Sequence, residues 1–412
     1  MASRRRTVLA TVIFLSMFLG CISQEERKEG ITLTVLTRHD TALQEVYEKA
    51  FLESELAKNA GITNIQFMQP ASALWPTAIE RGGIDVAWGG GPTLFDQLIE
   101  LDLLYEIKDP GVMEEVNAIP DDIGGAPMKR YKDGKLMWVA AAISSFGFTV
   151  NHKILQEYNL RMPVVWDDLA SPEFYKEPSV TAIGNAPDTT SNTRIYEIII
   201  QKYGWEEGWI MLTQIAANSA IYYSSVDVLS AVERGDVAVA ITIDFYGYSA
   251  MLDYPDTEYV IPQGQSIINA DPIVIVANTE KLEAANAFIK FVLSSEGQSF
   301  WLDEKINRMP VREDAFKTEF GKTRQDLKKL YEITVSNQGI EFSDELALSY
   351  EAMLKTYFEA VFDKPHKELK EAWAALIMAR STGAITEAKY NELLLKLGKP
   401  LLTIKEAQEL ND

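Results

Sequence analysis

The chain has 412 residues, 47% of them hydrophobic and 24% charged, a composition typical of a globular protein large enough for two or three packed regions. Its formal net charge of -21 would repel a phosphate backbone, so we expect no nucleic-acid partner. A single cysteine, Cys21, excludes an internal disulfide and a cysteine-rich metal cluster, and we expect neither a bound metal nor a cofactor.

The first twenty residues have the order of a secretory signal. Three arginines, Arg4 to Arg6, precede an apolar run over residues 8–19 that is too short for an ordinary membrane-spanning helix. The run ends at Gly20 and Cys21, which resembles the lipobox of prokaryotic lipoproteins, although an uncleaved anchor or a chance buried cysteine is the alternative. We therefore expect a lipoprotein signal peptide at 1–20, a polar tether at 21–30, and a protein held to the membrane outside the cytoplasm through lipidated Cys21.

The body of the chain alternates between expected strands and helices. A β-branched run at residues 31–36 is followed by a loop and by helical spacing over 42–56, and the same unit recurs over 65–81 and 84–101. Further strands are expected at 135–143, 147–150, 180–183, 220–223, 237–243 and 272–276. This alternation predicts an α/β fold with mainly parallel sheets flanked by helices. From residue 313 onward the pattern predicts amphipathic helices that cover the rest.

Six blocks, taken together and in order, resemble the extracellular solute-binding proteins of ABC importers. They lie at residues 85–91, 148–151, 163–169, 235–244, 269–273 and 293–298. The nearest branch of that family handles ferric ion, thiamine, phosphonates and sugar phosphates. The resemblance covers about residues 31–315 and implies a two-lobed, type II periplasmic-binding-protein-like fold, with strands crossing between the lobes near 141–147 and 267–273. It implies one lobe at 31–142 and 270–315, a second at 143–269, and a helical C-terminal region at 316–412 that packs on both.

Candidate binding residues in the first lobe follow the expected strands, because ligands of open parallel sheets lie beyond the carboxyl ends of the strands. The loop at 37–40 offers a positive charge and an imidazole, or else is a surface loop in which Asp40 caps a helix. The glycines at 89–91 let the backbone approach a ligand, or else serve only a tight turn. Ser72 precedes another expected helix and is either a cap or a contact. The candidates are Arg38, His39, Ser72, Gly90 and Gly91.

Candidates in the second lobe lie at two further strand ends. Residues 188–194 gather hydroxyls, amides and a guanidinium at a helix start, more donors than capping requires, and from them we select Thr190, Ser191 and Asn192. Asp244 and Tyr246 place an acid and a phenol after an apolar strand. In the ferric-ion members of the family that this sequence resembles, two adjacent tyrosines hold the metal at this place. Here Phe245 replaces the first tyrosine, which argues against iron.

These features predict a lipid-anchored solute-binding subunit of an ABC importer, not an enzyme, that works with permease and ATPase subunits. We expect its two lobes to close on a small anionic or zwitterionic solute, such as a phosphonate, a phosphate ester or a thiamine-like molecule. The three histidines lie far apart in the sequence, and no HExxH, GxSxG or Walker A pattern occurs. The alternatives are a ferric-ion-binding protein of the same family, a secreted hydrolase, and a lipid-anchored sensor.

Overall fold

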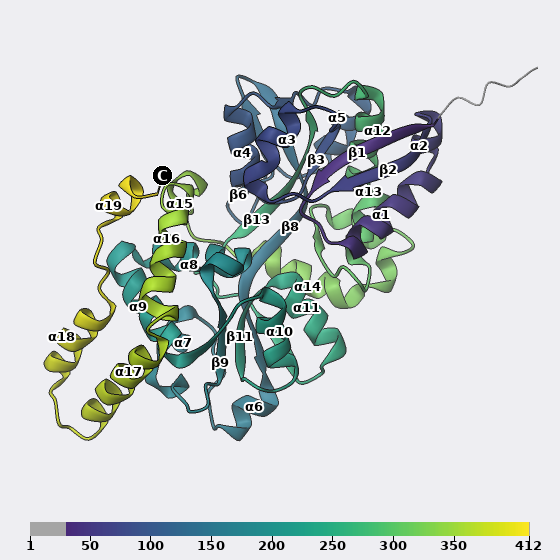
Figure 1. Ribbon diagram of the computed structural model, residues 1–412. Helices are drawn as coiled ribbons and strands as arrows, with labels where there is room; N and C mark the ends of the chain where they lie inside the picture. The colour runs from purple at the N-terminus through teal and green to yellow at the C-terminus, as the bar shows by residue number, and fades with distance from the viewer. Residues whose placement is uncertain (1–29, 412) are drawn as a thin grey trace, which may run out of the picture.

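Two long strands link two α/β bodies in the computed structural model, which describes residues 30–411 (Figure 1). The strands β8 (Lys135–Asn151) and β13 (Ile268–Val276) are antiparallel neighbours, paired from Ser145 and Ile268 to Val139 and Ile273. The two expected strands at 135–143 and 147–150 thus form one strand, because the polar residues between them stay extended and pair with β13. The expected signal peptide and Cys21 lie outside the described residues.

The first body, which we call lobe 1, is built on β1 (Ile31–Thr37). This strand is parallel to its neighbours β2 (Ile62–Met68) and β3 (Val86–Trp88), and β3 is antiparallel to β13. The helices of lobe 1 are α1 (Thr41–Glu53), α2 (Glu55–Asn59), α3 (Trp75–Glu80), α4 (Pro92–Glu100), α5 (Pro110–Asn117), α12 (Leu282–Leu293) and α13 (Ser295–Ser299). The single helix expected over 42–56 is two, because Ser54 is extended and its side chain caps α2 by accepting from Ala57 N.

The second body, lobe 2, has the same plan. The strand β9 (Thr181–Gly184) lies between β10 (Ser219–Tyr222) and β11 (Val239–Ile243) and is parallel to both, while β11 and β12 (Thr257–Val260) run antiparallel to β8. Its helices are α6 (His152–Glu157), α7 (Trp166–Ala170), α8 (Thr190–Tyr203), α9 (Trp205–Asn218), α10 (Ser225–Glu233) and α11 (Asp244–Asp253). One continuous sheet results, in the order β10-β9-β11-β8-β13-β3-β1-β2. The predicted α/β fold with helices flanking mainly parallel sheets is confirmed.

Three further short strands pair with the long crossing strands, and two more form a separate hairpin. They are β4 (Leu104–Tyr105), β5 (Asp122–Ile123), β6 (Ala126–Pro127), β7 (Lys129–Lys132) and β14 (Met309–Pro310). Of these, β7 and β14 pair with β8, β4 pairs with β13, and β5 and β6 pair with each other.

The C-terminal helices contact both lobes in turn. Helix α14 (Gln325–Ser336) packs on the lobe 1 core through Leu327 and Tyr331. The chain then passes to lobe 2, which it follows with α15 (Asp344–Leu348), α16 (Glu351–Phe358), α17 (His366–Ser381), α18 (Glu387–Gly398) and α19 (Ile404–Glu409) (Figure 1). The buried Trp373 of α17 joins the lobe 2 core and donates from Nε1 to Asn218 Oδ1 at 2.8 Å.

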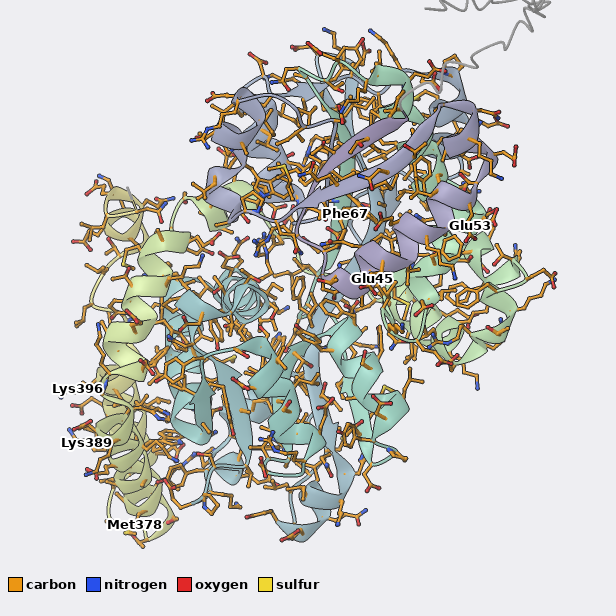
Figure 2. All side chains as sticks on the ribbon, turned by 45° about the vertical axis from the view of Figure 1, so that its right-hand side comes forward. Glu45, Glu53, Phe67, Met378, Lys389 and Lys396 are labelled. Atoms are coloured by element: carbon orange, nitrogen blue, oxygen red, sulfur yellow. The ribbon has the colours of Figure 1, made fainter. Side chains whose placement is uncertain are left out.

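The outer face of the C-terminal helices points away from lobe 2. Met378 lies at the end of this region in Figure 2 and is 67% exposed, and Lys389 and Lys396 project from α18. Within residues 30–411, no helix has the length and apolar character needed to cross a membrane.

Candidate functional site

Three loops at the carboxyl ends of the lobe 1 strands lie together. Arg38 follows β1, and its Nη1 lies 3.5 Å from Pro70 O in the loop that leads to Ser72. Its side chain also covers Gly90 after β3, where a Cβ would lie 3.0 Å from Arg38 Cγ. Gly90 has φ +114°, a conformation suited to glycine, so the close approach of this loop depends on the absence of a side chain. A Cβ on Gly91 would lie 3.3 Å from Asn269 Nδ2 on β13, so this loop faces the crossing strand.

His39 supports these loops from inside. It is 1% exposed, and its ring packs edge-on against Trp88 and Trp301 at centroid distances of 4.6 and 5.2 Å. Burial lowers the pKa of His39 to about 4, so the imidazole is neutral at pH 7. A Cβ on Gly89 would lie 2.5 Å from His39 Nε2, so the imidazole can pack here only because residue 89 has no side chain. Direct contact between His39 and a solute stays a prediction.

An ion pair that the sequence analysis missed joins these loops to lobe 2. Asp271 on β13 accepts a hydrogen bond from Gly90 N at 2.9 Å and pairs with Arg308 Nη1 at 2.9 Å. The Arg308 guanidinium lies 4.2 Å from the centre of the Phe245 ring, on the first turn of α11 in lobe 2. Asp271 falls inside one of the six blocks and could have been selected there. Arg308 belongs to no motif, so only the fold reveals it.

Asp244 begins α11 but its oxygens are already bonded within the protein. The carboxylate accepts from Ser145 N at 2.6 Å, from Ser145 Oγ at 3.2 Å and from Phe245 N at 2.8 Å. Burial raises the pKa of Asp244 to about 7, against the lowering effect of these hydrogen bonds. Asp244 thus fixes α11 against the crossing strand. Tyr246 is partly buried beside Phe245, with ring centroids 4.5 Å apart.

The three predicted binding residues at the start of α8 differ in burial, from a buried asparagine to an exposed threonine. Asn192 is buried and joins two strand ends, since its Oδ1 accepts from Gly184 N at 2.8 Å and its Nδ2 donates to Ile241 O at 3.3 Å. Ser191 Oγ lies 3.2 Å from Ser225 Oγ, which brings the starts of α8 and α10 together. Thr190, the first residue of α8, is exposed.

Arg194 of α8 reaches from lobe 2 to lobe 1. Its Nη2 donates to Thr93 Oγ1 at 2.9 Å, on the second residue of α4. The guanidinium also pairs with Asp344 and with Glu197, each at 3.2 Å. The start of α4 therefore contacts this arginine of α8, and the start of α10 is linked to α8 through Ser225 and Ser191. Free N–H groups at helix N-termini favour a negative group, so this corner has the chemistry of an anion site.

A small cavity lies beside this corner, between lobe 1, the start of the crossing strand β13 and residues 340–344. It has a volume of about 60 Å³, and its lining includes Pro92, Asn269, Phe342 and Asp344. Pockets that hold small molecules usually measure roughly 300–1,000 Å³, so this cavity is smaller than an ordinary solute pocket. Among residues 30–411, no group of three or more histidine, cysteine, aspartate and glutamate side chains is placed to hold a metal ion.

Comparison with known proteins gives a family and a curated relative. A family model described as bacterial extracellular solute-binding protein matches residues 84–329. The "phosphoglycerate transport regulatory protein PgtC" of Salmonella typhimurium is 24% identical over 245 residues, which are 59% of this chain. The match spans 58% of the relative's own length, less than two thirds of it.

Solved structures share the fold over most of the chain. An ABC transporter protein from Clostridium perfringens aligns with a TM-score of 0.61 at 20% identity, covering 80% of this chain and 99% of that one. AfuA from Actinobacillus pleuropneumoniae, with fructose-6-phosphate bound, gives 0.54 at 19% over 74% and 98%. Iron-bound HitA from Pseudomonas aeruginosa gives 0.55 at 18% over 73% and 99%. The predicted two-lobed fold of periplasmic binding proteins is confirmed by these likenesses.

Proposed function

Because the chain belongs to the bacterial extracellular solute-binding proteins, we propose that it is the lipid-anchored binding subunit of an ABC importer for a small phosphorylated anion. The family agrees with the resemblance found in the sequence and is one of transport binding proteins that act outside the cytoplasm with ABC permease and ATPase components. We propose three further properties: a lipid anchor at Cys21, a phosphorylated solute, and binding of that solute without chemical turnover.

The observation that carries the solute class is the hydrogen bond from Arg194 in lobe 2 to Thr93 in lobe 1. It brings the guanidinium of α8 to the start of α4, between the lobes. Hydrogen bonds to a charged group contribute about 1.5 to 3 kcal/mol each, so a few of them suffice for tight binding of a small anion. The name of the curated relative mentions phosphoglycerate, and AfuA has fructose-6-phosphate bound; both are phosphate esters, which supports the same class here.

The environments of Asp244 and Phe245 support a phosphorylated anion over the other candidate solutes. The oxygens of Asp244 are held by Ser145 and Phe245, so they offer less to a cationic group than the sequence suggested, and we place a phosphorylated anion ahead of a zwitterion. A ferric ion would face the Arg308 guanidinium beside Phe245, at the place where a tyrosine ligand is expected. Charge repulsion there disfavours iron.

A thermal-shift screen followed by calorimetric titration tests the solute class. We expect stabilisation by 3-phosphoglycerate or fructose 6-phosphate, and none by ferric citrate or neutral sugars. Changing both Thr190→Ala and Ser191→Ala should weaken binding about tenfold, from the loss of two hydroxyl contacts of about 0.5–1.5 kcal/mol each. Thr356→Ala, on the exposed side of α16, is the matched control. Stabilisation by ferric ion or neutral sugars alone would refute the proposal.

Membrane fractionation tests the anchor. Cys21→Ser should leave the protein unprocessed or release it from the membrane fraction, because the thioether to lipid cannot form. A processed Cys21→Ser protein that stays with the membrane like the parent would show that the anchor lies elsewhere.

A further inference from the structure

The segment that joins α14 to α16, residues 337–350, crosses from lobe 1 to lobe 2, and we call it the strap (Figure 1). Backbone hydrogen bonds hold its first part, with Gly339 N donating to Gly124 O at 3.2 Å and Ile340 N to Ser266 O at 2.9 Å. Gln201 of α8 then bonds Ser343 twice, donating to its O at 2.9 Å and accepting from its N at 2.8 Å. The strap lies beyond residues 84–329, which match the family model.

The strap places one carboxylate between the lobes. Asp344 Oδ1 accepts from Thr93 Oγ1 at 2.7 Å and lies 3.2 Å from Arg194 Nη2, which itself donates to Thr93 at 2.9 Å. Residues from lobe 1, lobe 2 and the C-terminal region thus form a closed triangle. Arg194 Cζ also lies over the Phe342 ring, 5.0 Å from its centroid.

Asp344 partly neutralises the positive charge of Arg194. Arg194 faces two carboxyl groups, Asp344 and the buried Glu197. Its Nη1 lies 3.2 Å from Glu197 Oε2 but makes no hydrogen bond, although the atom is buried. The arginine therefore keeps an unused donor while the strap already neutralises its charge. A solute anion gains little attraction here as long as Asp344 stays in place.

We propose that Asp344 is an internal competitor of the solute, which occupies the anion position between Thr93 and Arg194 and is displaced when the solute binds. The inference rests on the proposed function and adds an autoinhibitory contact to it. Displacement of Asp344 exchanges one anion for another on Arg194, and movement of the strap enlarges the cavity of about 60 Å³ that Phe342 and Asp344 help to line.

The test compares Asp344→Asn with the parent and with Glu345→Gln. Asparagine keeps a hydrogen-bond acceptor for Thr93 but loses the charge, while Glu345→Gln removes the same charge from the next, exposed residue. We expect Asp344→Asn to bind 3-phosphoglycerate about tenfold more tightly than the parent in calorimetric titration, and Glu345→Gln to bind within about twofold of it. Without ligand, backbone amides of the strap should exchange hydrogen faster in Asp344→Asn, and 3-phosphoglycerate should speed their exchange in the parent.

The outcomes distinguish a failure of this inference alone from a failure of the proposed function. Equal or weaker binding by Asp344→Asn overturns the competitor, because a purely structural Asp344 or one that contacts the solute would give that result. Unchanged exchange of the strap in Asp344→Asn overturns it as well. If Asp344→Asn binds inorganic phosphate more tightly than the parent and neither protein binds 3-phosphoglycerate, the competitor holds and the proposed phosphate ester is wrong. If neither protein binds them, both proposals fail.

Discussion

Replacing Glu197 by glutamine should change how the stability of the protein depends on pH. Burial is the main reason that the pKa of Glu197 rises from 4.5 to about 7, and the nearby Arg194 only partly offsets it. Below pH 4.5 the carboxyl group is protonated in both the folded and the unfolded chain, so it carries no penalty. As the pH rises toward about 7, only the unfolded chain loses the proton, and the free energy of unfolding falls.

The size of this effect follows from the raised pKa. One pKa unit corresponds to about 1.4 kcal/mol, so ionised Glu197 lowers the free energy of unfolding by about 3 kcal/mol above about pH 7. Glu197→Gln removes the titration but keeps an oxygen near Arg194. We expect the variant to be within about 1 kcal/mol of the parent at about pH 5 and about 3 kcal/mol more stable at about pH 8.

Urea unfolding followed by tryptophan fluorescence at both pH values measures this difference. Glu45→Gln is the control, because Glu45 is exposed on α1. The same pH dependence in the parent and Glu197→Gln would refute the reasoning, since it would mean that the carboxyl group titrates alike in both states. A variant less stable at about pH 8 would show that the charge on Glu197 is needed to hold Arg194.

Three further substitutions, one of them with a control, test the packing of the candidate loops and of the lobe 2 core. Asn192→Ala should lower the free energy of unfolding by about 1–3 kcal/mol, because two buried backbone groups lose their partner; urea unfolding without ligand measures it. Trp373→Phe should cost a similar amount by leaving Asn218 Oδ1 unpaired, whereas Met378→Ala, on the exposed side of α17, should change the midpoint little. Gly90→Ala should weaken solute binding and lower the melting temperature, because an added Cβ meets side chains at 3.0 Å at φ +114°.

The sequence alone determined the plan of the molecule. Alternating apolar runs and helical spacing are local properties, so they predicted the α/β lobes and the positions of the loops after β1, β3, β9 and β11. Six short blocks in order were enough to indicate the family. The strand pattern missed the continuity of β8, because polar residues interrupt its apolar run at the crossing.

The sequence did not separate ligand donors from groups that the fold uses itself. The same amide or carboxylate can bond a solute or a strand end, and burial decides which. Asn192, Asp244 and His39 all stood in candidate loops, yet each is buried and held by contacts within the protein.

Only the tertiary structure brought distant residues to the corner between the lobes. Thr93 and Arg194 are 101 positions apart, and Thr93 and Asp344 are 251 apart, so no motif joins them. Their contact depends on how two sheets and the strap pack across the crossing strands, a long-range arrangement that local spacing does not encode. The positions of the loops could therefore be predicted from the sequence. The charged side chains that lie opposite each loop are determined only by the tertiary structure.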